Sequence, residues 1–212
     1  MSVDPQTPVA ASPAAPPSVP FVGLTGGLAA GKSTALAALE RLGARTLSTD
    51  EVVHELYAGE ELRDLVVARW GSRVAPSGTV DRAEIAKVVF HDADERAWLE
   101  QQIWPRVGAA VVAFREDAAA QHPPARAAVV ETPLLFEAGM EAAYDATIAI
   151  VAPDDLRSDR ARQRGHDGIE GREARHLAQE EKAARATYTV VNDGTVQQLE
   201  ERLAAILDAL AP

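Results

Sequence analysis

The sequence contains no cysteine and only three lysines among its 212 residues. The absence of thiols excludes disulfide bonds, thiolate nucleophiles and thiolate metal sites, and it fits a reducing compartment. No apolar run is long enough to span a bilayer as a helix. We therefore expect a cytoplasmic protein that is not inserted in a membrane.

Positive charge is scarce, because the formal net charge is -11. An acidic chain is a poor ligand for nucleic acid, so we expect no nucleic-acid partner. If such a chain handles phosphates, it must concentrate its few cations locally. The positions of the lysines and arginines therefore indicate where a phosphate could bind.

One of the three lysines lies in a glycine-rich motif. The segment Gly26 to Ser33 reads GGLAAGKS and fits the phosphate-binding pattern G-x-x-x-x-G-K-S. An apolar strand is expected at 21–25 and a helix at 32–42, which is the context that this motif requires. A glycine-rich turn that precedes a lysine by chance is the alternative.

The physical reading of the motif is an anion cradle at a helix N-terminus. Lys32 would contact the β- and γ-phosphates, and the Ser33 hydroxyl would bind Mg²⁺. The predicted nucleotide-binding residues are consecutive: Gly27, Leu28, Ala29, Ala30, Gly31, Lys32, Ser33 and Thr34.

Four further apolar segments alternate with helical patterns, which predicts an α/β fold with a five-stranded parallel sheet. We expect these strands at 44–47, 127–131, 147–152 and 186–191. Asp50 follows the second strand, where a carboxylate could accept a hydroxyl proton, or it could merely cap the next helix. Glu131 ends the third strand, where it could reach the water shell of the metal or cap a turn.

The helical stretch 60–122 reads as an insertion that covers a second substrate, and Pro105 should kink or end its longest helix. Within it, Arg82 could grip a phosphate, although spacing alone favours a surface ion pair. The apolar segment Pro133, Leu134 and Leu135 could floor a substrate pocket or be plain packing.

Six arginines lie between 157 and 175 among hinge-like glycines. We interpret 156–182 as a lid whose guanidinium groups neutralise a transferring phosphoryl group, with a solvated surface face as the alternative. The nucleotide-binding core would then comprise 20–59, 123–155 and 183–212. The Pro/Ala-rich segment 1–19 reads as a disordered tail.

In order along the chain, these motifs resemble those of the dephospho-coenzyme A kinases. The resemblance covers residues 21–210 and includes the double-glycine loop, the segment Ser48 to Asp50, the segment 133–137 and the closing run Asn192-Asp193-Gly194. The sequence departs from the family pattern at three places. It has Ser48 to Asp50 where the family usually has Asp-Ala-Asp, and Trp104-Pro105 where the family has His-Pro. It also has Ala30 where serine is common.

The resemblance implies a P-loop kinase with a three-layer sandwich, a helical insertion and a lid. It implies transfer of the ATP γ-phosphate, with Mg²⁺, to the ribose 3′-hydroxyl of dephospho-coenzyme A. Asp50 would lie beside that hydroxyl, Arg82 in the substrate region and Asn192 near the adenine of ATP. The lid arginine would be Arg164, or else Arg160. Two rivals are another small-molecule kinase, such as a nucleoside monophosphate kinase, and a nucleotide-switched binding protein. A monomer is expected.

Overall fold

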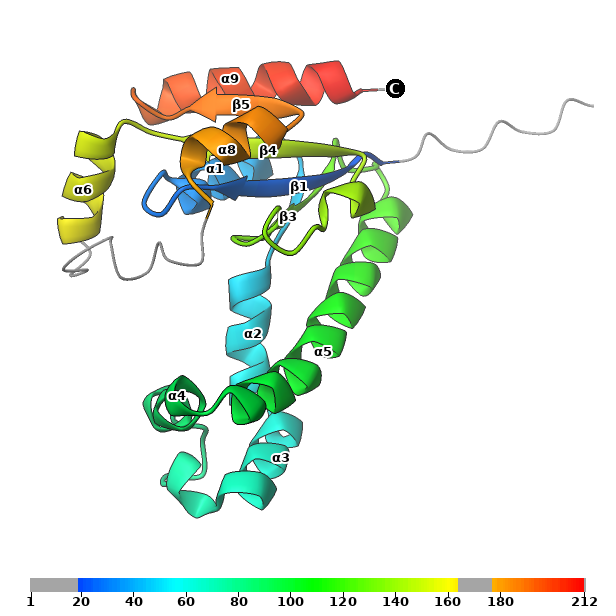
Figure 1. Cartoon of the computed structure of the whole chain (residues 1–212). Helices are drawn as coiled ribbons and strands as arrows, with labels where there is room; N and C mark the ends of the chain where they lie inside the picture. Colours follow the sequence, from blue (N-terminus) through cyan, green and yellow to red (C-terminus); the bar gives the residue numbers. More distant parts are fainter. Residues whose placement is uncertain (1–18, 164–176, 212) are drawn as a thin grey trace, which may run out of the picture.

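The computed structural model describes residues 19–163 and 177–211. Its centre is a five-stranded sheet in the order β2-β3-β1-β4-β5, with every neighbouring pair parallel (Figure 1). The strands are β1 (Phe21–Gly26), β2 (Arg45–Ser48), β3 (Ala128–Glu131), β4 (Ala146–Val151) and β5 (Tyr188–Val191). The predicted parallel sheet is confirmed.

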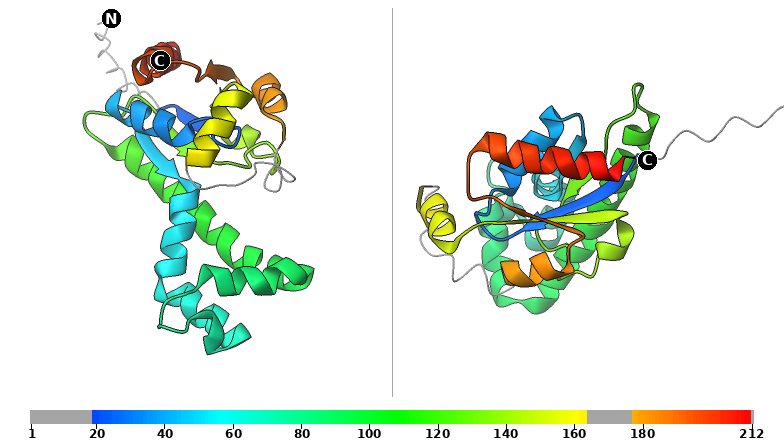
Figure 2. Two further views of the ribbon diagram at one scale, coloured as in Figure 1. Left: turned by 90° about the vertical axis from the view of Figure 1, so that its left-hand side faces the viewer. Right: turned by 90° about the horizontal axis from the view of Figure 1, so that it is seen from above.

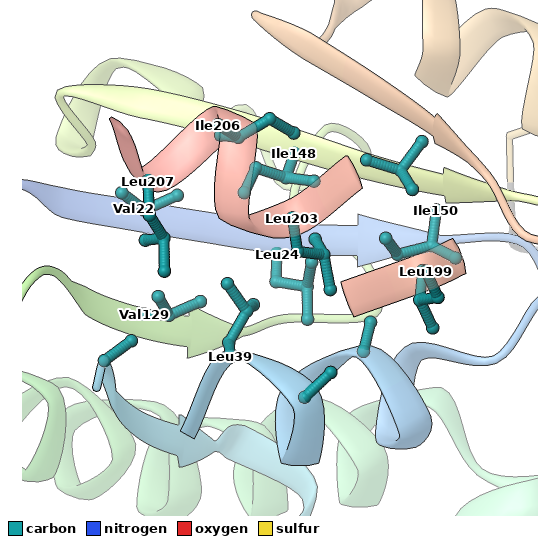
Figure 3. Packing of buried hydrophobic residues seen from close by; sticks show 14 of the residues in the cluster. Val22, Leu24, Leu39, Val129, Ile148, Ile150, Leu199, Leu203, Ile206 and Leu207 are labelled. Atoms are coloured by element: carbon teal, nitrogen blue, oxygen red, sulfur yellow. The ribbon is translucent and has the colours of Figure 1, made fainter. Parts of the chain in front are cut away.

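One face of the sheet is covered by α1 (Lys32–Arg41) and α9 (Val196–Leu210). Figure 3 shows the apolar side chains that meet between them, among them Leu24 of β1, Ile148 of β4, Leu39 of α1 and Leu203 of α9. All four are fully buried. The three central strands, β3, β1 and β4, are buried on both faces because helices cover both, as is usual in parallel sheets.

A capping box begins the last helix. The Thr195 hydroxyl accepts a hydrogen bond from the Gln198 backbone N–H, and the Gln198 side chain accepts one from the Thr195 N–H. This exchange satisfies two backbone donors at the start of α9.

The other face of the sheet is covered by the C-terminal part of α5 (Ala93–Ala120), the loop after β3, and α8 (Gln179–Arg185). Phe21 of β1 stacks on Tyr144 with ring centroids 4.9 Å apart. Leu135 and Phe136 are buried in the same cluster. The molecule is thus a three-layer sandwich, in which the right-hand view of Figure 2 places α9 above the sheet.

A helical body extends away from the sheet (Figures 1 and 2). Besides the start of α5 it contains α2 (Thr49–Ala58), α3 (Glu60–Trp70), the short η1 (Ser72–Val74) and α4 (Arg82–His91). It has a core of its own, in which Val52 of α2 packs with Leu62 of α3, Ile85 of α4 and Leu99 of α5. Helix α2 therefore packs with the helices that follow it, so the helical body begins directly after β2.

Helix α5 runs through Pro105 without ending there. The expectation that the proline could end the helix is therefore wrong. Proline has no N–H group, so the carbonyl group four residues before Pro105 lacks its helical donor. Because Pro105 is exposed, water can bind to that carbonyl group. The neighbouring carbonyl of Gln102 accepts a hydrogen bond of 2.6 Å from the Arg106 guanidinium.

The remaining helical elements of the described residues are α6 (Asp154–Gln163) and the short η2 (Glu141–Ala143). Residues 156–163 and 177–182 of the predicted lid are described, and they form α6 and the start of α8. Within the described ranges, none of the helices has the length and apolar character needed to cross a membrane.

Candidate active site

The phosphate loop, residues 26–33, joins β1 to α1 and requires glycine at two positions. Gly26 has φ 156° and Gly31 has φ 101°, a region that residues with a side chain rarely adopt. A Cβ atom on Gly31 would lie 2.1 Å from Nδ2 of Asn192, and one on Gly26 would lie 2.3 Å from the Ile150 carbonyl oxygen. A side chain at either position would force the neighbouring group to move.

Carbonyl groups of this loop are held by cations. Lys32 Nζ donates to the carbonyl oxygens of Gly26 and Gly27 at 3.3 and 3.1 Å. Arg157 Nε of α6 donates to the carbonyl oxygen of Leu28 at 2.9 Å. Because these bonds fix how the loop carbonyls point, they preorganise the loop for an anion.

Asn192, directly after β5, supports the far end of the loop. Its side-chain Nδ2 donates to the Ala30 carbonyl oxygen at 2.8 Å, and the residue is buried. Arg160 of α6 also contacts this point, because its guanidinium donates to the carbonyl oxygens of Ala30 and Asn192 at 3.4 and 3.3 Å. The sequence-predicted residues Asn192 and Arg160 therefore lie together against the phosphate loop.

Glu131 lies between the phosphate loop and the second strand, because β3 pairs with both β1 and β2. It is in register with Leu24 on one side and Ser48 on the other. Its Oε2 accepts a hydrogen bond of 2.8 Å from the Ser48 hydroxyl, and both residues are buried. Burial raises the pKa of Glu131, and the Ser48 bond opposes this effect.

Lys32 shares an electrostatic environment with both candidate carboxylates. Burial lowers the pKa of Lys32, and the charges of Glu131 and Asp50 oppose that shift. Asp50 also raises the pKa of Glu131. The three side chains are thus close enough to influence one another's charge, although they come from β1–α1, β3 and α2.

Asp50 lies in the first turn of α2 and is exposed. The residue at the N-cap is Ser48, and its side chain makes no capping hydrogen bond. The alternative that Asp50 caps this helix is therefore wrong. Asp50 instead lines a cavity.

This cavity, which we call the Asp50 cavity, has a volume of about 400 Å³ and lies between α2, α4 and α5. Its walls are mostly apolar, and its polar groups are Asp50, Tyr57, Arg96 and Glu100. A concave apolar site with a few polar groups is typical of a small-molecule site. The apolar and aromatic lining residues include Val53, Val89, Phe90, Leu99, Ile103 and Trp104.

Arg82 lies beside this cavity. Its guanidinium carbon is 5.5 Å from the centroid of the Tyr57 ring, which is part of the cavity wall. Among the described residues, no ion pair joins Arg82 to Asp81 or Glu84. The surface ion pair favoured by spacing is therefore not formed, and Asp81 instead caps α4 through the N–H groups of Ala83 and Glu84.

The segment Pro133, Leu134 and Leu135 does not line the Asp50 cavity. Leu135 is fully buried under the sheet, while Pro133 and Leu134 are half-buried. The Pro133 carbonyl oxygen accepts hydrogen bonds from Thr25 Oγ1 at 3.2 Å and from Lys182 Nζ at 2.6 Å. In this structure the segment anchors the loop after β3 to β1 and α8.

Lys182 was not among the residues predicted from the sequence. It is fully buried and pairs with Glu137 at 2.9 Å. Ser48 and Arg157 were also missed as functional neighbours of Glu131 and the phosphate loop. The scarcity of lysine and the resemblance of the closing segment, which begins at Glu181-Lys182, were the signals that pointed to Lys182. Arg164, the first choice for the lid arginine, lies outside the described residues.

The site offers oxygen donors of the kind that Mg²⁺ prefers. Ser33 is exposed at the start of α1, and Glu131 has one oxygen that is not bonded to Ser48. Within the described parts of the chain, no three acidic or histidine side chains cluster tightly enough to hold a metal by themselves. The donor set therefore suits an ion that shares its coordination with phosphate and water.

These features define a P-loop kinase: a parallel α/β sheet, a phosphate loop at a helix N-terminus, and an adjoining helical body with its own cavity. A family model described as dephospho-CoA kinase matches residues 20–198. The chain therefore belongs to the dephospho-CoA kinase family, which confirms the resemblance noted in the sequence.

Individual relatives agree with this assignment. A dephospho-CoA kinase of Moorella thermoacetica is 39% identical over 182 residues, which are 84% of this chain and 85% of that protein. One from Deinococcus radiodurans is 38% identical over 203 residues, with 94% and 96% of the two chains covered.

Solved structures show the same fold. TT1252 of Thermus thermophilus superposes with a TM-score of 0.76 at 30% identity, with 92% of this chain and all of that chain covered. A dephospho-CoA kinase from Campylobacter jejuni, at 21% identity, has a TM-score of 0.62, with 92% and 98% covered.

Proposed function

We propose that this protein transfers the γ-phosphate of ATP to the ribose 3′-hydroxyl of dephospho-coenzyme A. The observation that carries the proposal is the position of Asp50. This carboxylate lines the Asp50 cavity and also acts electrostatically on Lys32 of the phosphate loop. It would therefore lie between a site for the phosphoryl donor and a site for the acceptor, and family membership supports the identity of both.

The phosphate loop would hold the ATP phosphates through its backbone N–H groups. Lys32 would exchange the carbonyl oxygens of Gly26 and Gly27 for phosphate oxygens, which a flexible ammonium group can do without moving the backbone. Asn192 and Arg160 support the same loop at Ala30. We also propose that Asn192 contacts the adenine of ATP and that Arg160 contacts the transferring phosphoryl group.

Ser33 and Glu131 would hold the magnesium ion, Glu131 through water. When bound, Mg²⁺ supplies positive charge to the phosphate oxygens. Ser48 keeps the Glu131 carboxylate in place by its hydrogen bond of 2.8 Å. Neither Ser33 nor Glu131 needs to take part in proton transfer.

Asp50 would accept the proton of the acceptor hydroxyl or orient its lone pair toward the phosphorus atom. Arg82 would lie beside the bound acceptor, close to Tyr57 of the cavity wall. Because phosphoryl transfer depends mainly on positioning and electrostatics, these few groups suffice for the reaction. We also propose that the protein works in the cytoplasm as a monomer.

A coupled assay of ADP release tests the proposal with three acceptors in parallel: dephospho-coenzyme A, its 3′-deoxy analogue, and AMP. We expect turnover only with the first, and a product that coelutes with coenzyme A. Turnover with AMP would indicate a nucleoside monophosphate kinase. ADP release without any acceptor would favour a nucleotide-switched protein.

A further inference from the structure

Two large aromatic side chains are exposed at the Asp50 cavity. Trp104 of α5 is 57% exposed and Phe90 of α4 is 75% exposed, and both line the cavity. They are among the few large apolar side chains that the described part of the chain leaves in solvent. Exposed aromatic surface beside a cavity marks a place where a ligand is expected to cover it.

We propose that Trp104 and Phe90 form an adenine-binding rim, against which the adenine ring of the acceptor stacks while its ribose hydroxyl lies at Asp50. This inference rests on the proposed function, and it assigns one part of the acceptor to one part of the cavity. The two residues would then determine which acceptor binds, without taking part in the chemistry.

The charges of the cavity argue against the diphosphate group as its occupant. Asp50 and Glu100 contribute two carboxylates, and Arg96 contributes one guanidinium. That guanidinium already donates to the carbonyl oxygens of Val89 and Phe90, at 3.0 to 3.5 Å. Even with Arg82 beside the Tyr57 ring counted, the charges at the cavity only balance, so a diphosphate inside it would gain no net attraction. The occupant should therefore be an uncharged part of the acceptor.

Dephospho-coenzyme A has two uncharged parts, the adenine ring and the pantetheine arm. The adenine ring is bonded directly to the ribose that carries the reacting hydroxyl, whereas the pantetheine arm begins beyond the diphosphate. Because Asp50 itself lines the cavity, a ribose bound there brings the adenine ring in with it. The pantetheine arm could enter only if the diphosphate passed through the cavity first.

The aromatic rim fits a planar base better than a flexible chain. Bases stack on aromatic side chains with a stabilisation of about 1–3 kcal/mol per base. The remaining wall is mostly apolar, and Val53, Leu99 and Ile103 line the same space. An adenine ring can therefore contact apolar groups below it and aromatic rings at the rim.

The test compares the wild-type chain with Trp104→Ala, Trp104→Phe and Val112→Ala. Val112 is a matched control because it is also on α5, is also 57% exposed and is not part of the cavity lining. Titration calorimetry would measure the Kd values of dephospho-coenzyme A, adenosine and 4′-phosphopantetheine. A saturating non-hydrolysable ATP analogue with Mg²⁺ would keep adenosine out of the donor site.

For Trp104→Ala we expect the Kd values of dephospho-coenzyme A and adenosine to rise by the same factor, about 5- to 150-fold. The Kd of 4′-phosphopantetheine should not change. Trp104→Phe should restore most of the affinity, and Val112→Ala should have no effect. Adenosine should also quench tryptophan fluorescence in the wild type, and this quenching should be lost in Trp104→Phe.

Three results would overturn the inference: no binding of adenosine by the wild type, unchanged adenosine affinity in Trp104→Ala, or a loss confined to 4′-phosphopantetheine. The last result would assign the pantetheine arm to the cavity. Failure of the proposed function would look different, because the wild type would then bind ATP but release no ADP with dephospho-coenzyme A. Equal melting temperatures of the variants would show that folding is not affected.

Discussion

At the residue scale, Asp50 connects the cavity to the phosphate loop. We expect Asp50→Asn to lower kcat by at least about 100-fold, because an amide cannot accept the proton of the acceptor hydroxyl. The Kd of ATP should change little, since the loop carbonyls and N–H groups are untouched. Steady-state kinetics and titration calorimetry would measure the two effects separately.

The neighbouring Glu51 provides the control for this substitution. It is also exposed in the first turn of α2, but it is not part of the cavity lining. Glu51→Gln removes a similar charge and should leave kcat close to the wild-type value. A near-normal kcat for Asp50→Asn would contradict the proposed role.

The conformation of the phosphate loop depends on the single residue Gly31. Gly31 and Gly43 both have positive φ, 101° and 92°, so alanine at either position should cost about 1–2 kcal/mol in backbone strain. Only at Gly31 would the new Cβ collide with Asn192, at 2.1 Å; at Gly43 the nearest atom, in Arg126, is 3.5 Å away. Gly31→Ala should therefore weaken ATP binding strongly, whereas Gly43→Ala should lower only the melting temperature.

Thermal melts and ATP titrations of both glycine variants would check this prediction. If the two variants bound ATP equally well, the contact between Gly31 and Asn192 would not control the loop.

At the element scale, Lys182 joins α8 to the loop after β3. Its ammonium is fully buried and bonded to Glu137 and to the Pro133 carbonyl oxygen. Lys182→Met leaves the carboxylate of Glu137, whose side chain is 14% exposed, without its cation, which should cost about 3–5 kcal/mol. For a chain of this size, the melting temperature should fall by roughly 6–20 °C.

A second substitution separates the charge from the packing. Lys182→Met combined with Glu137→Leu removes both charges, so much of the lost stability should return. Lys87→Met breaks an exposed pair with Glu84 and should have almost no effect. If the double variant were no more stable than Lys182→Met, the unpaired carboxylate would not be the cause.

The same pair predicts how stability depends on pH. Burial opposes ionisation of Glu137, but hydrogen bonds from Lys182 and the Leu177 N–H lower its pKa below the ordinary value. The stabilisation from this carboxylate is therefore fully present above the unfolded pKa of about 4.3, and it is lost as the pH falls through the lower folded value.

Urea unfolding of the wild type and of the double variant, from pH 7 down to about pH 3, would measure this dependence. The stability difference between the two proteins should narrow only in acid. A constant difference over the whole range would show that Glu137 titrates alike in the folded and unfolded chains.

At the scale of the whole molecule, the sequence predicted the elements better than their arrangement. Hydrophobic runs located the five strands, and the glycine-rich motif located the phosphate loop. The strand order was not predictable from these runs, because any of them could pair with any other. The insertion of β3 between β1 and β2 is what brings Glu131 within electrostatic reach of both Lys32 and Asp50.

The sequence patterns also could not predict contacts between segments that are distant in the sequence. Ser48 and Glu131 are 83 residues apart, yet the sheet register makes them neighbours. Leu135, predicted to be a substrate residue, is fully buried in the core instead, because the loop after β3 turns under the sheet. Periodicity describes which residues are apolar, but not which apolar surface they meet.

Ligand binding couples the phosphate loop to the stability of the whole chain. ATP at about 100 times its Kd should stabilise the folded state by about 2.7 kcal/mol. The melting temperature should then rise by roughly 5–11 °C.

Lys32→Ala should abolish phosphoryl transfer and most of this rise in melting temperature, because Lys32 is the lysine that the phosphate loop contributes. Lys87→Ala, at an exposed lysine of α4, should retain both. Differential scanning fluorimetry with and without ATP measures the shift, and a full shift in Lys32→Ala would mean that ATP binds elsewhere on the molecule.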